Sequence, residues 1–187
     1  MLKRKLIMLA TMLVALLLNH SVLAALNPAL IDSARSGDLS TIETALKQGA
    51  NINDTDDNGY SLLILSIYHN QNHIAAYLLA HGANPNQTDN HGRSALMGAA
   101  FNGDIKAAQV LLQDPRTQIN LQNDVGQTAA MFAALFGHKA FLQFLSEKGA
   151  DLQIADKKGN TAASLAAAQG NQDLADWISS QKKTPKS

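Results

Sequence analysis

The chain of 187 residues carries 15 basic and 15 acidic side chains, so its formal net charge at pH 7 is zero. This balance gives no electrostatic footprint for nucleic acid, which requires a clear excess of Lys and Arg. The sequence contains no cysteine, and this excludes disulfides, thiol catalysis and cysteine-ligated metals.

The first 24 residues differ in kind from the rest of the chain. A basic stretch at 3–5 precedes an uncharged apolar run of 13 residues at 6–18. That run is too short to cross a bilayer of about 30 Å, but it suits the apolar core of a secretory signal. Small residues, Val22 and Ala24, stand where a signal peptidase reads the chain. The sequence therefore predicts a signal peptide at 1–24 that is cut after Ala24; an uncleaved N-terminal anchor is the alternative.

Removal of this segment takes away three basic side chains and no acidic one, which leaves 12 against 15 and a net charge of −3. No cysteine is present for lipid attachment at the cleavage site. We therefore expect a soluble protein exported to a bacterial periplasm, with no stable membrane insertion after the signal is removed.

From residue 25 onward, certain residues recur at a fixed period. The intervals are 33, 34 and 33 for two sets of positions. These sets are Gly59, Gly92, Gly126 and Gly159, and Asn53, Asn86, Asn120 and Gln153. A period in the thirties is typical of a repeat array.

Each repeat carries the signals of two short helices and a turn. Two residues after each periodic glycine stands a hydroxyl that can cap a helix by accepting a free backbone N–H. These residues are Ser61, Ser94, Thr128 and Thr161. An alanine-rich run follows the cap, and a second apolar segment then ends near glycine, as helices often do. The predicted units are 26–53, 54–86, 87–120, 121–153 and 154–181, within a repeat domain at 25–181 that is followed by a polar tail at 182–187.

The fourth unit resembles the ankyrin-repeat family, whose motif runs Gly-x-Thr-Pro-Leu-His-x-Ala-Ala, then Gly-His, Leu-Leu and Gly-Ala-Asp-x-Asn. The matching residues are Gly126, Thr128, Ala133, Ala134, Gly137, His138, Gly149, Ala150 and Asp151. The proline and histidine of the central tetrapeptide are absent from every unit. The resemblance covers residues 26 to about 181. It implies an all-α ankyrin-repeat solenoid of about five helix–turn–helix units with β-hairpin-like fingers.

Few residues suggest a metal-binding or catalytic site. Residues 54–59 imitate the start of an EF-hand calcium loop, but the twelfth position, where a bidentate glutamate is required, is Leu65. His69 and His73 fall at the end of one predicted helix and the start of the next, so they do not share the face that metal ligation requires. No acid, base and nucleophile converge in the repeat phase. We expect no metal, no cofactor and no catalysis.

The family resemblance implies a concave surface, formed by the finger tips and the outer end of each first helix, that binds partners. Aromatic residues make up only 5% of the chain, yet the central units carry aromatic rings at these positions. Exposed apolar patches with polar rims are typical of partner sites. The predicted protein-binding site consists of Tyr60, Tyr68, His69, Arg93, Phe101, Asn102, Gln127, Leu135 and Phe136. The alternative is that the rings pack between units and stiffen the stack.

The expected function is that of a monomeric, non-catalytic, exported module for protein–protein interaction. Resemblance to exported bacterial ankyrin proteins implies one of two partners: an enzyme of oxidative-stress defence, or a toxic effector that is neutralised in the periplasm. The alternatives are a periplasmic hydrolase that uses a cleft in the repeat groove, and a structural spacer.

Overall fold

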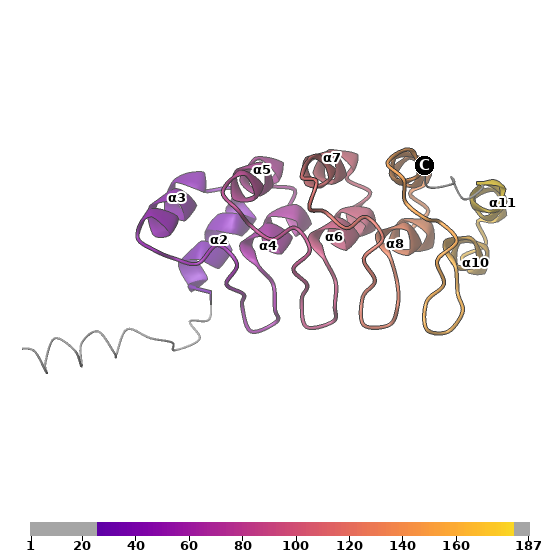
Figure 1. The fold of residues 1–187 in the computed structure, drawn as a ribbon, viewed down its shortest axis with the longest axis horizontal. Helices are drawn as coiled ribbons and strands as arrows, with labels where there is room; N and C mark the ends of the chain where they lie inside the picture. Colours follow the sequence, from indigo (N-terminus) through magenta and orange to yellow (C-terminus); the bar gives the residue numbers. More distant parts are fainter. Residues whose placement is uncertain (1–25, 182–187) are drawn as a thin grey trace, which may run out of the picture.

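The computed structural model describes residues 26–181, which form ten helices in two rows with a series of fingers on one side (Figure 1). The signal peptide and the tail that the sequence predicts lie outside the described residues. The inner row, next to the fingers, holds α2 (Pro28–Ser36), α4 (Leu62–Tyr68), α6 (Ala95–Asn102), α8 (Ala129–Leu135) and α10 (Ala162–Ala168). The outer row holds α3 (Leu39–Lys47), α5 (Asn72–Ala80), α7 (Ile105–Gln113), α9 (Lys139–Glu147) and α11 (Gln172–Ser180). The prediction of an all-α repeat solenoid is confirmed.

The inner helices begin where the hydroxyl caps were predicted. The side-chain oxygens of the four caps each accept the backbone N–H three residues further on, at 3.3 to 3.5 Å. The caps are Ser61, Ser94, Thr128 and Thr161. In α10 the bond is reciprocal, because Ser164 also accepts the N–H of Thr161 at 2.9 Å. Such caps stabilise helices of only seven or eight residues, which are too short to be stable alone.

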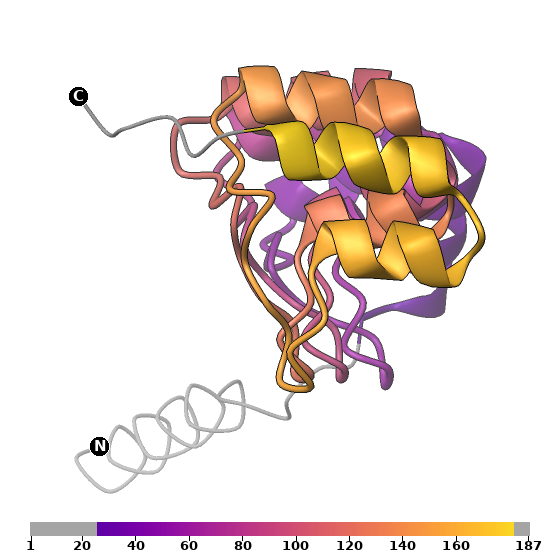
Figure 2. The ribbon, with the colours of Figure 1, turned by 90° about the vertical axis from the view of Figure 1, so that its right-hand side faces the viewer.

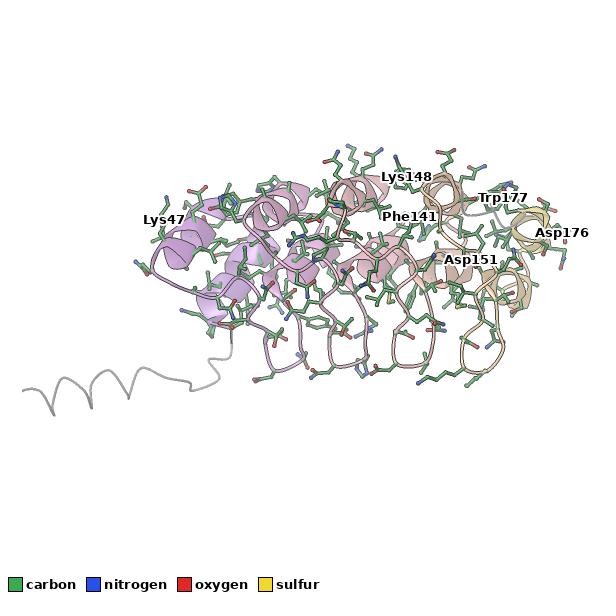
Figure 3. All side chains as sticks on the ribbon, viewed as in Figure 1. Lys47, Phe141, Lys148, Asp151, Asp176 and Trp177 are labelled. Carbon is green, nitrogen blue, oxygen red and sulfur yellow. The ribbon has the colours of Figure 1, made fainter. Side chains whose placement is uncertain are left out.

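The core lies between the rows and between neighbouring units. Ala99 and Ala100 of α6 and Ala133 and Ala134 of α8 are fully buried, so the inner helices approach closely. Phe141 of α9 is 1% exposed, and it is the largest fully buried side chain among the described residues. Figure 3 places charged side chains such as Lys148 on the outer-helix side of the array. The outer helices therefore bury one face and expose the other, whereas α4 and α6 of the inner row are buried along most of their length.

Asparagine side chains join each unit to the next, and this explains why asparagine keeps the repeat period. In three units the side-chain oxygen accepts a backbone N–H of the following unit, at 2.7 to 2.9 Å. The pairs, acceptor first, are Asn53 with Asn84, Asn86 with Gln118, and Asn120 with Asp151. Gln153, the fourth member of the series, instead donates to the carbonyls of Ile178 and Gln181 at 3.4 and 3.3 Å.

Each finger is closed by one carboxylate or amide side chain near its tip. Its Oδ1 accepts the backbone N–H groups two and four residues further on, at 2.8 to 3.1 Å. These residues are Asp56, Asp89, Asn123 and Asp156. Isolated antiparallel bridges, Thr55 with Ser61 and Thr88 with Ser94, add to the hairpin-like form.

Neighbouring fingers are also bonded to one another, so they form a connected row. Backbone N–H groups of three fingers donate to a carbonyl of the preceding finger, at 3.0 to 3.3 Å. The donor and acceptor residues are Asn90 and Asn58, Asp124 and His91, and Lys157 and Val125. The end-on view shows the fingers projecting at an angle from the two rows of helices (Figure 2). We call the surface formed by the fingers and the inner helices the concave face.

Gly126→Ala and Gly159→Ala form a matched pair that tests the packing of the fingers. Both glycines have a left-handed φ, 87° and 82°, in which alanine is strained by about 1–2 kcal/mol. A Cβ on Gly126 would lie 2.8 Å from the backbone nitrogen of Lys157, whereas a Cβ on Gly159 would meet no atom of the described chain within 4 Å. We expect Gly126→Ala to lower the free energy of unfolding by about 1–3 kcal/mol more than Gly159→Ala. Urea unfolding measures both, and equal losses would contradict this account.

Asp156→Asn tests the carboxylate that closes the last finger. Hydrogen bonds from the Asn160 side chain, and then from the backbone of Asn160 and Lys158, lower the pKa of Asp156 below its ordinary value. Because the pKa is lower in the folded state, this carboxylate stabilises the fold above its unfolded pKa, and the contribution is lost as pH falls through the folded pKa. Asn123 closes its finger with an amide, so Asp156→Asn should keep the finger at neutral pH and reduce the loss of stability in acid.

The measurement is the thermal unfolding midpoint between neutral pH and about pH 3, a window that spans the ordinary pKa of aspartate. The control is Asp124→Asn in the neighbouring finger, because the side chain of Asp124 accepts no hydrogen bond from residues 26–181. Asp124→Asn should leave the acid sensitivity of the wild type unchanged. An unchanged acid sensitivity in Asp156→Asn would refute the role given to Asp156.

Candidate functional site

The residues predicted to bind a partner come from three adjacent units and share the concave face. In each unit one residue precedes the helix cap, and two lie at the end of the inner helix. The first set is Tyr60, Arg93 and Gln127, and the second is Tyr68, His69, Phe101, Asn102, Leu135 and Phe136. Because α4, α6 and α8 pack side by side, equivalent positions stand in rows across the array (Figure 1).

Phe101 and Phe136 form an exposed aromatic pair between the third and fourth units. Their ring centroids are 4.6 Å apart, and their planes make an angle of 71°. Each residue is 45% exposed. Among the described residues, the other large hydrophobic side chain with such exposure is Val125, at the tip of the finger of the fourth unit. Within residues 26–181, the large apolar side chains that stay exposed thus lie on the concave face and its fingers.

Tyr60 and Tyr68, by contrast, pack into the array. Their centroids are 5.9 Å apart at 70°, and both rings are half-buried against the core. The ring of Tyr68 covers Gly98 of the next unit, where an added Cβ would lie 3.3 Å from the ring. Glycine inside a helix costs about 1 kcal/mol relative to alanine, so its presence here is explained by the space it leaves for Tyr68. These two rings therefore pack between units, and their role in partner binding stays a prediction.

Arg93 is held in place by Asp89, whose side chain is fully buried. The Arg93 Nε donates to Asp89 Oδ2 at 2.7 Å, while Asp89 Oδ1 accepts two backbone N–H groups of the finger. The Arg93 Nη2 also donates to the Tyr60 hydroxyl at 3.1 Å. Burial alone would lower the pKa of Arg93, but the hydrogen bond to Asp89 and nearby charges raise it above its ordinary value. Burial raises the pKa of the Tyr68 hydroxyl.

The remaining predicted residues lie around these groups. Asn102 donates to the carbonyl of Tyr68 at 3.4 Å, and Gln127 accepts from the side chain of Asn123 at 3.4 Å. His69 is exposed at the end of α4, and Leu135 is half-buried. The His69 side chain makes no hydrogen bond within residues 26–181, and Leu135 has no polar side-chain atom.

Two residues that shape the site, Asp89 and Gly98, are not among those predicted from the sequence. A signal existed for Gly98, because the equivalent positions hold Leu65, Phe132 and Leu165. A signal existed for Asp89 as well, because it stands four residues before Arg93, as Asp156 stands before Asn160.

The histidines and acidic residues do not form a metal site in residues 26–181, where no three of them are grouped to hold an ion. His69 ends α4, whereas His73 lies in α5 with its Nε2 3.2 Å from the carbonyl of Gly37. Leu65, at the twelfth position of the calcium-like segment, is 3% exposed. None of the helices within 26–181 is long and apolar enough to cross a bilayer.

Tyr68→Ala and Phe101→Ala compare two rings at equivalent positions. Tyr68→Ala should lower the free energy of unfolding by about 1–3 kcal/mol, because it removes a half-buried ring from a contact between units. Phe101→Ala removes an exposed ring and the contact with Phe136, a loss of about 1 kcal/mol or less. Chemical unfolding of both variants gives the two values. A larger loss for Phe101→Ala would show that the exposed pair, too, serves packing.

Among curated proteins, the chain is similar to the NAD-capped RNA hydrolase NUDT12 of Macaca fascicularis, Pongo abelii and Homo sapiens. In each case 34% of residues are identical over 80 aligned residues, which make up 43% of this chain and 17% of the relative. Because so little of these relatives is covered, their hydrolase activity is not carried over to this chain.

The family model described as ankyrin repeats in three copies matches residues 30–123 and again 115–186. Ankyrin repeats generally mediate protein–protein interactions, and domains made of them are typically not enzymes. The two matches span most of the sequence, and the stacked helix pairs and fingers agree with them. The chain belongs to the ankyrin-repeat family.

Proposed function

We propose that this protein is an exported, non-catalytic module that binds a protein partner on its concave face. The observation that carries the proposal is the contact between Phe101 and Phe136, two large rings that remain 45% exposed although each touches the other. Aromatic side chains grouped at the centre of a surface commonly supply most of the energy of binding.

The outer face offers no comparable anchor among the described residues. Its aromatic residues, Tyr77, Phe144 and Trp177, are half-buried and pack against the core. Two of them are also covered by the residue one turn later. The His81 ring stacks on Tyr77 at 3.9 Å, and Lys148 lies 5.7 Å from the centroid of Phe144.

The connected fingers support the same conclusion. Each finger is closed internally and bonded to its neighbour, so the concave face is formed before a partner arrives. A preformed surface avoids the cost of ordering loops on binding, which otherwise reduces affinity. A structural spacer would need the stacking but would leave the exposed aromatic pair without a role.

Export is the second part of the proposal, and it is supported by the basic stretch at 3–5, the apolar run at 6–18 and the small residues before Ala25. We place the mature protein in a bacterial periplasm, as a monomer. Its partner there is an enzyme of oxidative-stress defence, or a toxic effector that this protein neutralises.

The double variant Phe101→Ser/Phe136→Ser, in the mature chain from Ala25, tests the concave face. Affinity capture from periplasmic extract followed by mass spectrometry identifies the partner, and calorimetry with the purified partner gives the affinity. We expect the variant to bind at least ten-fold more weakly, because loss of an aromatic anchor costs about 2 kcal/mol or more. The unfolding midpoint should change little, because both rings are exposed.

Lys148→Ala on the outer face is the matched control and should bind like the wild type. Equal binding by the double variant and the wild type would refute the concave site. N-terminal sequencing of the protein in the same extract should start at Ala25, and a start at Met1 would refute cleavage.

A further inference from the structure

Hydrogen-bond donors without acceptors gather on the concave face where the second and third units meet. Tyr60 accepts from Arg93 at 3.1 Å, so the phenol hydrogen of Tyr60 points elsewhere. The hydroxyl of Tyr68 has no hydrogen-bond partner within residues 26–181, nor has Nη1 of Arg93. Three side chains therefore offer N–H or O–H groups to whatever binds there.

The neighbouring acid cannot satisfy these donors. Asp89 Oδ1 accepts the backbone N–H groups of His91 and Arg93, both at 2.9 Å, and its Oδ2 accepts from Arg93 Nε. The Asp89 side chain is 0% exposed, whereas that of Arg93 is 30% exposed. Asp89 thus fixes the Nε edge of the guanidinium group, while part of the Arg93 side chain remains exposed.

We propose that Tyr60, Tyr68 and Arg93 together bind the carboxylate of an acidic side chain on the protein partner. This inference deepens the proposed function and rests on it. A planar guanidinium group with adjacent hydroxyl donors suits a carboxylate, and hydrogen bonds between charged groups are stronger than neutral ones.

The charges nearby favour one acidic side chain over a nucleic-acid backbone. Asp57 and Asp124, in the fingers on either side of the finger that carries Arg93, are exposed. They would repel a nucleic-acid backbone, whose row of phosphates would pass over both aspartates. A single carboxylate would contact only the donors of Tyr60, Tyr68 and Arg93. The mature chain is also acidic overall.

The distance between the carboxylate site and the aromatic pair defines the spacing of the acidic and apolar residues in the partner segment. Tyr68 and Phe101 occupy equivalent positions in adjacent units, and packed helix axes lie about 8–10 Å apart. An extended chain covers that distance in about three residues. The partner segment therefore carries Asp or Glu about three residues away from the large apolar side chain that contacts Phe101 and Phe136.

The test uses a random dodecapeptide library displayed on phage and selected on the mature chain. We expect enriched peptides to combine Asp or Glu with a large apolar residue at the spacing given above. One enriched peptide, synthesised with Glu and with Gln at the acidic position, is then titrated against the wild type, Arg93→Asn and Tyr68→Phe. Arg93→Asn should preserve the finger, because Asn160 makes the equivalent bond to Asp156 at 3.0 Å in the last unit.

The wild type should bind the Glu peptide at least about ten-fold more tightly than the Gln peptide, the factor associated with one hydrogen bond to a charged group. Arg93→Asn should abolish this preference, and Tyr68→Phe should reduce it, with melting temperatures near that of the wild type. Lys148→Ala, on the outer-helix side of the array, is the control and should keep the full preference.

Two outcomes would overturn the inference: enriched peptides without an acidic residue, or an Arg93→Asn variant that weakens both peptides equally. The result also separates this inference from the proposed function. Peptides that need Phe101 and Phe136 but show no preference for Glu refute only the carboxylate site. Peptides that bind equally well to Phe101→Ser/Phe136→Ser refute the concave binding face itself.

Discussion

Close packing between neighbouring inner helices sets the spacing of the array, and α6, α8 and α10 are rich in alanine where they pack. A single unit cannot bury its apolar face alone, so the fold depends on stacking. Ala100 of α6 and Ala134 of α8 are fully buried, and small side chains at such positions let the helices approach closely. The same stacking brings Phe101 and Phe136, at the ends of these two helices, into contact at 4.6 Å. The exposed aromatic pair is therefore a product of the repeat geometry.

The chain lacks the proline and histidine of the family's central tetrapeptide, and the structure shows what serves in their place. Ile64, Met97 and Met131 stand at the histidine position, and each is 1% exposed, so this position contributes to the core. Bonds between units come from the asparagine series, the row of fingers and the ring of His138, whose Nε2 lies 3.0 Å from the carbonyl of Phe101. At the histidine position, apolar packing thus replaces a polar side chain, and the units still stack.

The sequence predicted the fold well because each signal recurs at the same phase, so caps, glycines and asparagines reinforce one another. The site was harder to predict, because exposure depends on the opposite residue in the next unit. Tyr68 and Phe101 are equivalent in sequence, yet Tyr68 lies on Gly98, whereas the bulkier Phe132 stands at the equivalent position opposite Phe101. The bond between Arg93 and Asp89 likewise depends on which finger residues face inward, and the repeat period does not reveal this.

The finger of the third unit shows how a structural contact can also position a group of the proposed site. Every described finger is closed by an Asp or Asn side chain, and in the finger of the third unit the same carboxylate also fixes Arg93. Immobilising a long, flexible side chain on binding costs about 0.5–1.5 kcal/mol. Arg93 is already immobilised by Asp89 in the free protein, so binding would not add this cost. The exposed rings are also restrained, because each packs against the other. The polar and apolar groups of the proposed site are therefore both ordered by the fold.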